Sequence, residues 1–227
     1  MGAELPMLER EEFDTRLQKC SPVPVSAQVR ADLYLHYLEL RRWNRSLSLV
    51  GPSRRDEIVE RHYGESLAAA PLIGKKDKQT VDLGSGAGFP GLILAMARPD
   101  LEVILIEARE RKWAFLTTVC RKAALSVTCL NARVGATLPE GVPETIDVVT
   151  SRALKLSPDV LAAVTQRLSP AGQLLLWTGK TDPNMPAGLT VVASRRLPGA
   201  TTRRLLQIRR GAVPLGHHRD RGREWPA

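Results

Sequence analysis

The sequence predicts an α/β fold in which a mostly parallel sheet carries helices on both faces. From residue 79 onward, short apolar runs alternate with stretches of helical periodicity, the pattern of strand–helix units. A glycine-rich turn, GSGAGFPG at 84–91, directly follows the first run. Residues 1–78 carry helical patterns and no strand signal. We therefore expect a helical extension at 1–78, an α/β domain at 79–210 and a basic tail at 211–227.

The extension is predicted to contain two principal helices. The segment DLYLHYLELRRW at 32–43 places Leu33, Tyr37 and Leu40 on one side of a helix, which gives it an apolar stripe. A second helix is expected from residue 56 to about residue 70, ending before Pro71.

Seven strands and three helices are expected in the α/β domain. Two of the strands, 189–197 and 202–209, are separated by Pro-Gly-Ala and predict an antiparallel hairpin at the sheet edge. The other expected strands are 80–83, 101–107, 127–131, 146–150 and 173–177, and the expected helices are 91–98, 109–124 and 157–168.

Composition favours a polyanionic partner and a reducing compartment. The formal charge is +9, from 33 Lys and Arg against 24 Asp and Glu, which favours nucleic acid. The cysteines Cys20, Cys120 and Cys129 form no CxxC pair, so neither a disulfide framework nor a zinc site is expected. The N-terminus resembles no signal peptide, and no apolar run approaches the roughly 20 residues of a membrane span. We expect a cytoplasmic monomer that binds no metal and no membrane.

The glycine-rich turn predicts a ligand that backbone approaches closely, at the amino end of the following helix. No Lys follows the glycines, which excludes a phosphate-binding loop of the nucleoside triphosphatase type, whereas residues 86–91 do satisfy the dinucleotide pattern GxGxxG. Asp82 would repel a pyrophosphate and attract a sulfonium and an ammonium group. Glu107, at the end of the next strand, is placed to accept ribose hydroxyls from either class of nucleotide. The pair favours S-adenosylmethionine over NAD, and a helix-capping role for Asp82 is the competing structural interpretation.

The segment TVDLGSGAGFPG at 80–91 resembles the first motif of the bacterial 16S ribosomal RNA guanine-N7 methyltransferase family known as GidB or RsmG. The resemblance covers most of the chain and implies a class I S-adenosylmethionine-dependent methyltransferase (Rossmann-like) fold, with a mostly parallel seven-stranded sheet and an N-terminal helical cap. It also implies methyl transfer to N7 of a guanine in the decoding-region loop of 16S rRNA, free or within the small ribosomal subunit. Further matches follow in the family's order and spacing: Trp43-Asn44, Arg61-His62, Glu65-Ser66-Leu67, Arg98-Pro99, Arg133-Val134 and Thr150-Ser151-Arg152-Ala153.

The resemblance implies roles for individual residues. Arg152 is expected between cofactor and target base, as the catalytic residue, although an ordinary ion-paired surface arginine is the competing interpretation. Arg61 and His62 are expected in the cap over the active site, where His62 also suits a plain helix-surface position. The expected cofactor-binding residues are Asp82, Gly84, Ser85, Gly86, Phe89, Glu107, Val134, Gly135 and Arg152, and the expected RNA contacts are Arg61, His62, Lys180, Arg203 and Arg204.

The sequence also departs from the family's pattern at five polar positions. Gly135 replaces a Glu beside the adenine, and Thr178 replaces a Lys for which Lys180 is a possible substitute. Ser48, Glu65 and Arg204 stand where the family has Asn, Asp and His. These departures leave two alternatives open: a degenerate methyltransferase fold that binds RNA or a protein partner, and a methyltransferase for another RNA site or a small molecule. An NAD-dependent oxidoreductase is disfavoured by Asp82.

The expected chemistry requires few groups. Guanine N7 has a lone pair and no proton, so attack on the sulfonium methyl needs no general base, and catalysis rests on alignment. Cys129 lies within an expected strand, where a structural role is favoured over a nucleophilic one. RNA contact is expected along the C-terminal region, where residues 195–227 contain two acidic residues and nine arginines, at positions 195, 196, 203, 204, 209, 210, 219, 221 and 223.

Overall fold

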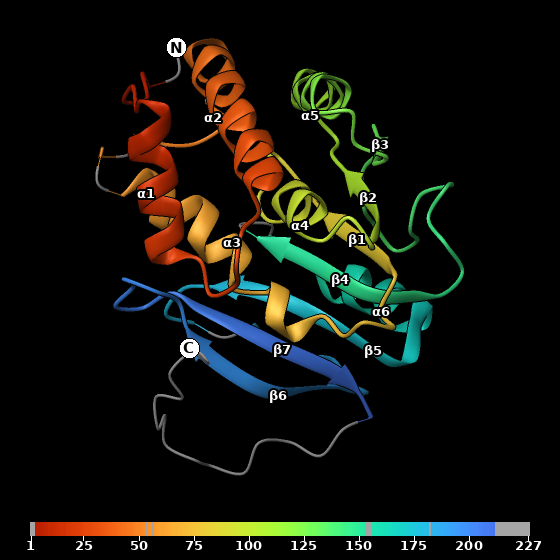
Figure 1. Cartoon of the computed structure of the whole chain (residues 1–227). Helices are drawn as coiled ribbons and strands as arrows, with labels where there is room; N and C mark the ends of the chain where they lie inside the picture. Colours follow the sequence, from red (N-terminus) through yellow and green to blue (C-terminus); the bar gives the residue numbers. More distant parts are fainter. Residues whose placement is uncertain (1–2, 53, 56, 153–155, 182, 212–227) are drawn as a thin grey trace.

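The computed structural model describes residues 3–52, 54–55, 57–152, 156–181 and 183–211. It contains a seven-stranded sheet with the order β3-β2-β1-β4-β5-β7-β6 (Figure 1). The predicted tail, apart from Gly211, and Ala153 of the Ser-Arg-Ala motif lie outside the described residues. The sheet is mixed, since β7 runs antiparallel to both of its neighbours, β5 and β6. The predicted hairpin and the predicted number of strands are confirmed.

The strands and helices of the α/β domain follow the predicted order closely. The strands are β1 (Gln79–Leu83), β2 (Glu102–Ile106), β3 (Thr128–Leu130), β4 (Ile146–Arg152), β5 (Leu168–Thr178), β6 (Leu189–Arg196) and β7 (Arg204–Arg210). The helices are α4 (Gly91–Ala97), α5 (Glu110–Lys122) and α6 (Pro158–Arg167). The largest difference is in β5, which begins at Leu168 because Leu168 already pairs with Ile146, ahead of an irregularity in the register.

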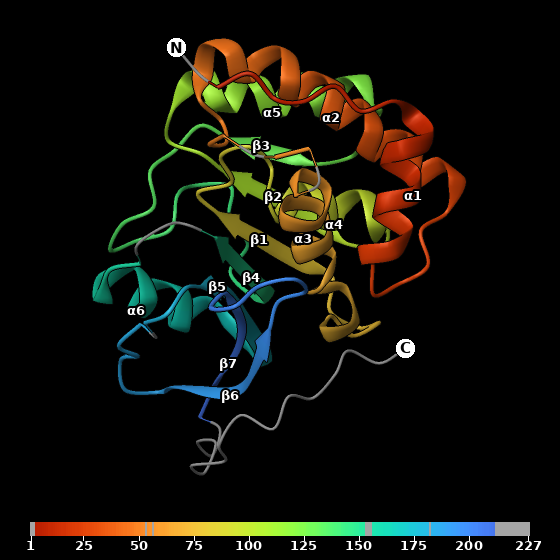
Figure 2. The same ribbon diagram turned by 90° about the vertical axis from the view of Figure 1, so that its left-hand side faces the viewer.

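Alternate residues of the central strands enter two different hydrophobic clusters. Val103 and Leu105 pack in the cluster that contains α4, α5 and the N-terminal helices, whereas Ile104 and Ile106 pack in the cluster that contains α6. Figures 1 and 2 show α6 on the sheet face opposite α4 and α5. Both faces of the central strands are therefore covered, which explains why these strands read as continuous apolar runs.

The N-terminal residues form α1 (Arg10–Cys20), α2 (Ala27–Leu47) and a segment of irregular helix. This segment corrects the second predicted helix: it is a π-helix, Val59–Gly64, followed by α3 (Glu65–Leu67) and a 3-10 turn, Ala70–Leu72. Apolar periodicity does not reveal such a widened turn, and π-helical turns are frequent at functional sites. Residues 61, 62 and 65, all implicated by the resemblance, lie in or directly after it.

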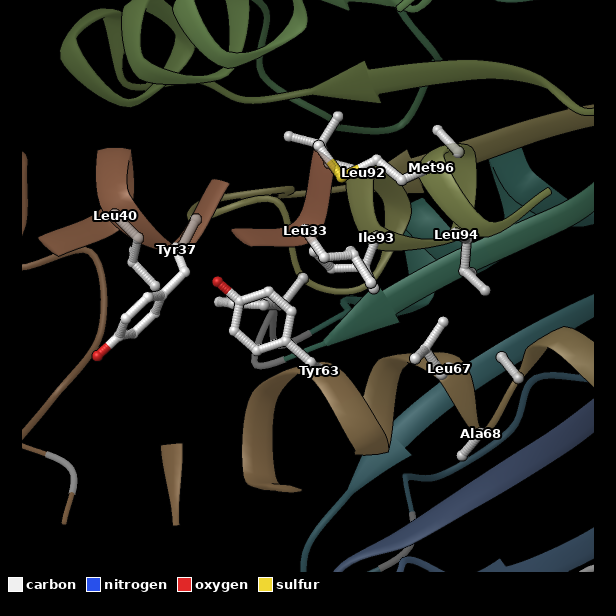
Figure 3. Close-up of a cluster of buried hydrophobic side chains, with 14 of the residues drawn as sticks. Leu33, Tyr37, Leu40, Tyr63, Leu67, Ala68, Leu92, Ile93, Leu94 and Met96 are labelled. Atoms are coloured by element: carbon white, nitrogen blue, oxygen red, sulfur yellow. The ribbon is translucent and has the colours of Figure 1, made fainter. Parts of the chain in front are cut away.

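The N-terminal helices share one core with the sheet. Figure 3 shows Leu33 and Tyr37 of α2 and Tyr63 and Leu67 of the irregular segment near four labelled residues of α4: Leu92, Ile93, Leu94 and Met96. Each of the four side chains from α2 and the irregular segment is fully buried. The extension and the α/β domain therefore share one hydrophobic core.

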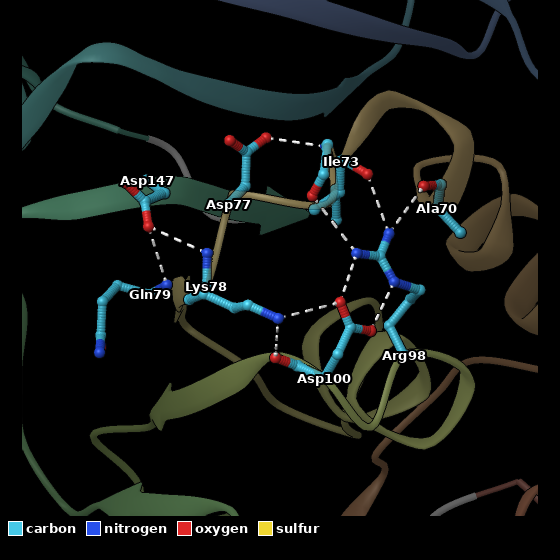
Figure 4. Close-up of polar contacts among 9 residues, drawn as sticks. Ala70, Ile73, Asp77, Lys78, Gln79, Arg98, Asp100 and Asp147 are labelled. Carbon is cyan, nitrogen blue, oxygen red and sulfur yellow. Dashed lines mark hydrogen bonds and ion pairs between the residues drawn. The ribbon is translucent and has the colours of Figure 1, made fainter.

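Polar contacts at the amino end of β1 hold the connector between extension and sheet (Figure 4). The backbone N–H groups of Lys78 and Gln79 donate to Oδ2 of Asp147 over 3.0 and 3.1 Å. Arg98 donates to the Ile73 carbonyl over 2.9 Å and to both carboxylate oxygens of Asp100. The Arg98 hydrogen bonds lower the pKa of Asp100 to about 2. The Arg98 of the Arg-Pro motif thus has a structural role, at the end of the strand remote from the glycine turn.

Membrane spans and metal clusters are both absent from the described part of the chain. Within it, no helix is long and apolar enough to cross a membrane. Nor do three or more His, Cys, Asp or Glu side chains within it form a group able to hold a metal ion.

Candidate active site

A cavity of about 750 Å³ opens at the carboxyl ends of β1, β2, β4 and β5. This is the usual place for a ligand in an open α/β sheet. Its floor includes Gly84, Gly86 and Glu107, and its opposite wall comes from residues 49–51 and from Arg61 and His62 of the irregular helix. Segments far apart in the sequence therefore meet around a single space.

The glycine turn has a conformation that side chains disfavour. Gly84, Gly86 and Gly88 have φ values of 70°, 55° and 86°. The backbone N–H groups of Gly84 and Ser85 donate to the Ile106 carbonyl over 2.9 and 3.0 Å, which ties the turn to the end of β2. The residues predicted there, Gly84, Ser85, Gly86 and Phe89, all line the cavity.

Glu107 is a buried carboxylate already fixed by backbone donors. Its Oε2 accepts from the Gly86 N–H over 2.9 Å, and its Oε1 accepts from the Arg109 N–H over 2.8 Å. Each carboxylate oxygen can accept more than one hydrogen bond. Glu107 therefore retains capacity for two hydroxyl donors at the cavity floor, as the sequence predicted for a ribose.

Asp82 lies behind the glycine turn and not on the cavity wall, which corrects the expectation of direct contact with the ligand. Within β1 it alternates with the apolar residues Val81 and Leu83, so its side chain faces α4. A Cβ added to Gly91 would lie 2.4 Å from the Asp82 Cβ, which shows how tightly helix and strand meet. Oδ1 accepts from the Thr150 hydroxyl over 2.6 Å, whereas Oδ2 is buried without a partner. Burial raises the pKa of Asp82 to about 6.

His36 supports the turn from the opposite side, a role that sequence reasoning missed. Its Nε2 lies 2.9 Å from the Ala87 carbonyl and donates to it, and its Nδ1 accepts from the Tyr63 hydroxyl over 2.8 Å. Full burial lowers the pKa of His36 to about 4, so the ring is neutral. The sequence does contain an indication that His36 is buried, because it lies on the same helix face as Leu33, Tyr37 and Leu40, which is otherwise apolar.

Arg152 meets a buried carboxylate, Glu65, that sequence comparison identified only as a departure. Arg152 Nη2 donates to Glu65 Oε2 over 3.0 Å and to the Arg61 carbonyl over 3.0 Å. Arg203 Nε donates to Glu65 Oε1 over 2.7 Å. The Trp177 indole donates to the Glu65 carbonyl over 2.9 Å. Burial is the main cause that lowers the pKa of Arg152, and its Nη1 is buried without a partner.

His62 is part of the cavity wall and is not exposed on the helix surface. Its ring stacks on Phe89 with centroids 5.0 Å apart and an interplanar angle of 26°. Burial, and then the charge of Arg152, lower the pKa of His62 to about 3. A ring that stays neutral near pH 7 offers stacking and no charge.

The remaining predicted residues divide into two groups. Val134 lines the cavity, but Gly135 does not, and a Cβ added there meets nothing within 4 Å. Lys180 and Arg204 also lie outside the lining; Arg204 Nη2 donates to the Lys180 carbonyl over 3.3 Å. Cys129 lies in β3, outside the cavity lining, with its Sγ 3.8 Å from that of Cys120.

The charge of the lining is divided between its two carboxylates and a larger set of cations. Glu65 is already neutralised by two arginines, which leaves Glu107 as the acceptor for a ligand. A nucleoside whose hydroxyls meet Glu107, and whose base adjoins Val134, fits this floor. The cationic residues of the lining are Arg61, Arg109, Lys112, Arg133, Arg152 and Arg203, which suit a polyanion.

Comparison with known proteins agrees with this geometry. A family model described as rRNA small subunit methyltransferase G matches residues 30–185. The ribosomal RNA small subunit methyltransferase G of Acidothermus cellulolyticus is 43% identical over 153 residues, which cover 66% of this chain and 66% of that protein, just under two thirds of its length. The protein of the same name from Methylorubrum extorquens is 35% identical over 191 residues, covering 83% of this chain and 81% of its own.

Similarity among solved structures concerns the fold alone. A SAM dependent methyltransferase from Aquifex aeolicus superposes with a TM-score of 0.52 at 18% identity, over 63% of this chain and 88% of that chain. The predicted Rossmann-like methyltransferase fold is confirmed.

Proposed function

Because the chain belongs to the rRNA small subunit methyltransferase G (GidB) family, we propose that it methylates N7 of a guanine in the decoding-region loop of 16S rRNA. S-adenosylmethionine, when bound, supplies an electrophilic methyl group on a sulfonium sulfur. The proposed substrate is 16S rRNA or the small ribosomal subunit, and the proposed place of action is therefore the cytoplasm. The observation that supports the proposal is one cavity whose lining combines the glycine turn and the buried Glu107 with five arginines and a lysine.

In this proposal the floor holds the cofactor. Glu107 accepts its two ribose hydroxyls, and the backbone of Gly84–Gly86 approaches it closely because no side chain intervenes. Val134 packs against its base. Asp82 acts indirectly, by packing beneath Gly91 and fixing the turn and the first residue of α4.

The arginine-rich wall holds the RNA. Arg152 lines the cavity, and in this proposal its guanidinium group donates to O6 of the target guanine. The neutral His62, already stacked on Phe89, offers a flat surface beside the base. Neither residue accepts a proton, and none is released, because N7 reacts through its lone pair. The rate enhancement therefore comes from alignment and exclusion of water.

The test is methyl transfer with identification of the product. Small subunits that lack the modification are incubated with methyl-labelled S-adenosylmethionine, and the digested rRNA is analysed by mass spectrometry. We expect 7-methylguanosine at one site. Glu107→Ala should abolish methyl transfer. Arg167→Ala, which removes the ion pair between Arg167 of α6 and Glu144, should leave methyl transfer unchanged. Label in another nucleoside would refute the N7 assignment, and cofactor binding without transfer would favour a degenerate, RNA-binding member.

A further inference from the structure

Glu65 and three arginines form a compact group that cofactor binding does not explain. We call Glu65, Arg61, Arg152 and Arg203 the arginine cluster. Glu65 is fully buried, and its Oε1 accepts from both Nε and Nη2 of Arg203, over 2.7 and 2.6 Å. Its Oε2 accepts from Arg152 over 3.0 Å. Three cations against one carboxylate leave a net positive charge, enough to bind an anion.

Several donors of the cluster are unused by the described residues. Arg152 Nη1 is buried without a partner. The Arg61 side chain is exposed and makes no hydrogen bond or ion pair with the part of the chain that the structure describes. Arg203 has a side chain that is 37% exposed, and Glu65 engages only one edge of its guanidinium group. A buried carboxylate that fixes one edge of an arginine preorganises the rest of its donors for a second anion.

Arg61 and Arg203 stand at the boundary between two cavities. Both line the main cavity, and both line a second one of about 290 Å³ together with Glu57, Glu60, Pro198 and Gly199. The second cavity is lined by two carboxylates, each paired with an arginine: Glu60 Oε1 accepts from Arg16 over 3.4 Å, and Glu57 Oε1 lies 4.0 Å from Arg54 Nε. Oε2 of Glu60 is buried without a partner. Its carboxylates repel phosphate but accept hydrogen bonds from the amino group of a nucleobase. Two cavities that each suit a base, with cations between them, match a dinucleotide, in which one phosphodiester joins two nucleosides.

We propose that Arg61 and Arg203 bind the single phosphodiester that joins the target nucleotide, in the main cavity, to a neighbouring nucleotide whose base enters the second cavity. The proposal rests on the proposed function, because it takes RNA as the substrate. Glu65 is a positioning residue: it holds the Arg203 guanidinium at the boundary and acts on the phosphate only through it. The subsite thereby selects for a strand that is extended at the target nucleotide.

The test uses short RNAs of the decoding-region loop that carry one uncharged methylphosphonate linkage, either 5′ or 3′ of the target guanine. Binding is measured by fluorescence anisotropy. For the unaltered protein, one of the two neutral linkages should weaken binding about tenfold. Arg203→Ala should weaken binding of the charged RNA by a similar factor, should no longer distinguish the neutral linkage, and should lower the salt slope by about 0.7.

The matched control is Arg167→Ala, because Arg167 is also partly exposed and also ion-paired, but lies on α6 across the sheet. It should behave as the unaltered protein. If Arg203 binds this phosphate, combining Arg203→Ala with the neutral linkage should weaken RNA binding no further than either change alone. If the two losses of affinity multiply instead, the proposal is overturned. So would RNA binding that Arg203→Ala leaves unchanged.

Two further measurements distinguish a phosphodiester subsite from a site for the cofactor carboxylate. Calorimetric titration with S-adenosylmethionine should give the same Kd for Arg203→Ala and the unaltered protein; a tenfold loss would assign the cluster to the cofactor carboxylate and overturn the proposal. Glu65→Asp, which keeps the charge, should retain the preference for the charged linkage, whereas Glu65→Gln, if folded by circular dichroism, should lose it. Selective binding without methyl transfer would refute the proposed function and leave the subsite standing.

Discussion

The buried carboxyl group of Asp82 gives the stability of this protein a pH dependence whose sign and size follow from the structure. Burial is the largest cause that raises its pKa from 3.8 to about 6, against the hydrogen bond from Thr150. The folded state therefore binds a proton more tightly than the unfolded state. The stability contribution of this carboxyl group is present below about pH 4 and falls as the pH rises to about 6 and beyond. A pKa difference of this size corresponds to about 3 kcal/mol in the free energy of unfolding.

Two buried histidines oppose this effect in the same pH range. The pKa of His36 is lowered to about 4 and that of His62 to about 3, both chiefly by burial. Such groups bind fewer protons when folded, so their contribution rises with pH up to the ordinary histidine value. Together their pKa shifts exceed that of Asp82, so the unaltered protein alone would gain stability over this range and would mask the contribution of the carboxyl group. The informative quantity is the difference in free energy of unfolding between the protein and its Asp82→Asn variant.

The assay is urea unfolding followed by circular dichroism, for both proteins, at steps from pH 4 to pH 8. The stability of the unaltered protein relative to Asp82→Asn should fall by about 2 kcal/mol across this range, with most of the change between pH 4 and 6; the rest of the difference lies below pH 4. Thr150→Val removes the 2.6 Å donor to Oδ1 and should move the change to higher pH. A difference that does not vary with pH would refute the argument, because it would mean that Asp82 titrates alike in the folded and unfolded states.

Three further substitutions test the site. Glu107→Gln places an amide N–H against a backbone donor, either the Gly86 N–H or the Arg109 N–H. It should weaken S-adenosylmethionine binding about tenfold, measured by calorimetry. An unchanged Kd would contradict the proposed role of Glu107. Gly91→Ala puts a Cβ 2.4 Å from that of Asp82 and should cost about 3 kcal/mol of stability, whereas an alanine at position 179, where nothing lies within 4 Å, should not; equal Tm values would argue against the tight contact. A side chain at Gly135 would contact nothing within 4 Å of its Cβ, so Gly135→Glu should leave the Tm unchanged. It restores the family's carboxylate beside the adenine and should tighten cofactor binding severalfold; weaker binding would contradict that role.

The sequence predicts most of the fold because local signals agree with tertiary packing. Each central strand is a short apolar run between turn signals, and its two faces do enter two cores. The glycine turn can be identified from sequence because four glycines in eight residues, directly after an apolar run, are typical of a turn that needs positive φ values. The irregular helix at 59–72 escapes prediction, since a π-turn leaves the apolar pattern helical while changing which residues point into the cavity.

The two carboxylates at the ends of β1 and β2 show where sequence reasoning about a site fails. Both were expected to touch the ligand. Asp82 lies inside β1, where alternation turns its side chain under α4, while Glu107 is the first residue beyond β2 and is free to turn toward the cavity. Relative to the strand end the two residues differ by two positions, and this difference leaves Asp82 behind the glycine turn and places Glu107 in the cavity lining. Sequence alone does not fix that end.

The arginine cluster illustrates a second limit, because its members have no local relation. Glu65 is separated from Arg152 by 87 residues and from Arg203 by 138. Comparison with the family pattern marks Glu65 only as a longer acid in place of Asp, and assigns Arg203 only to a basic region. The fold joins them: one oxygen of Glu65 accepts from Arg152 at the end of β4, and the other accepts from Arg203, directly before β7. A departure that sequence reasoning counted against activity thus becomes part of the geometry that holds two arginines of the cavity lining in place.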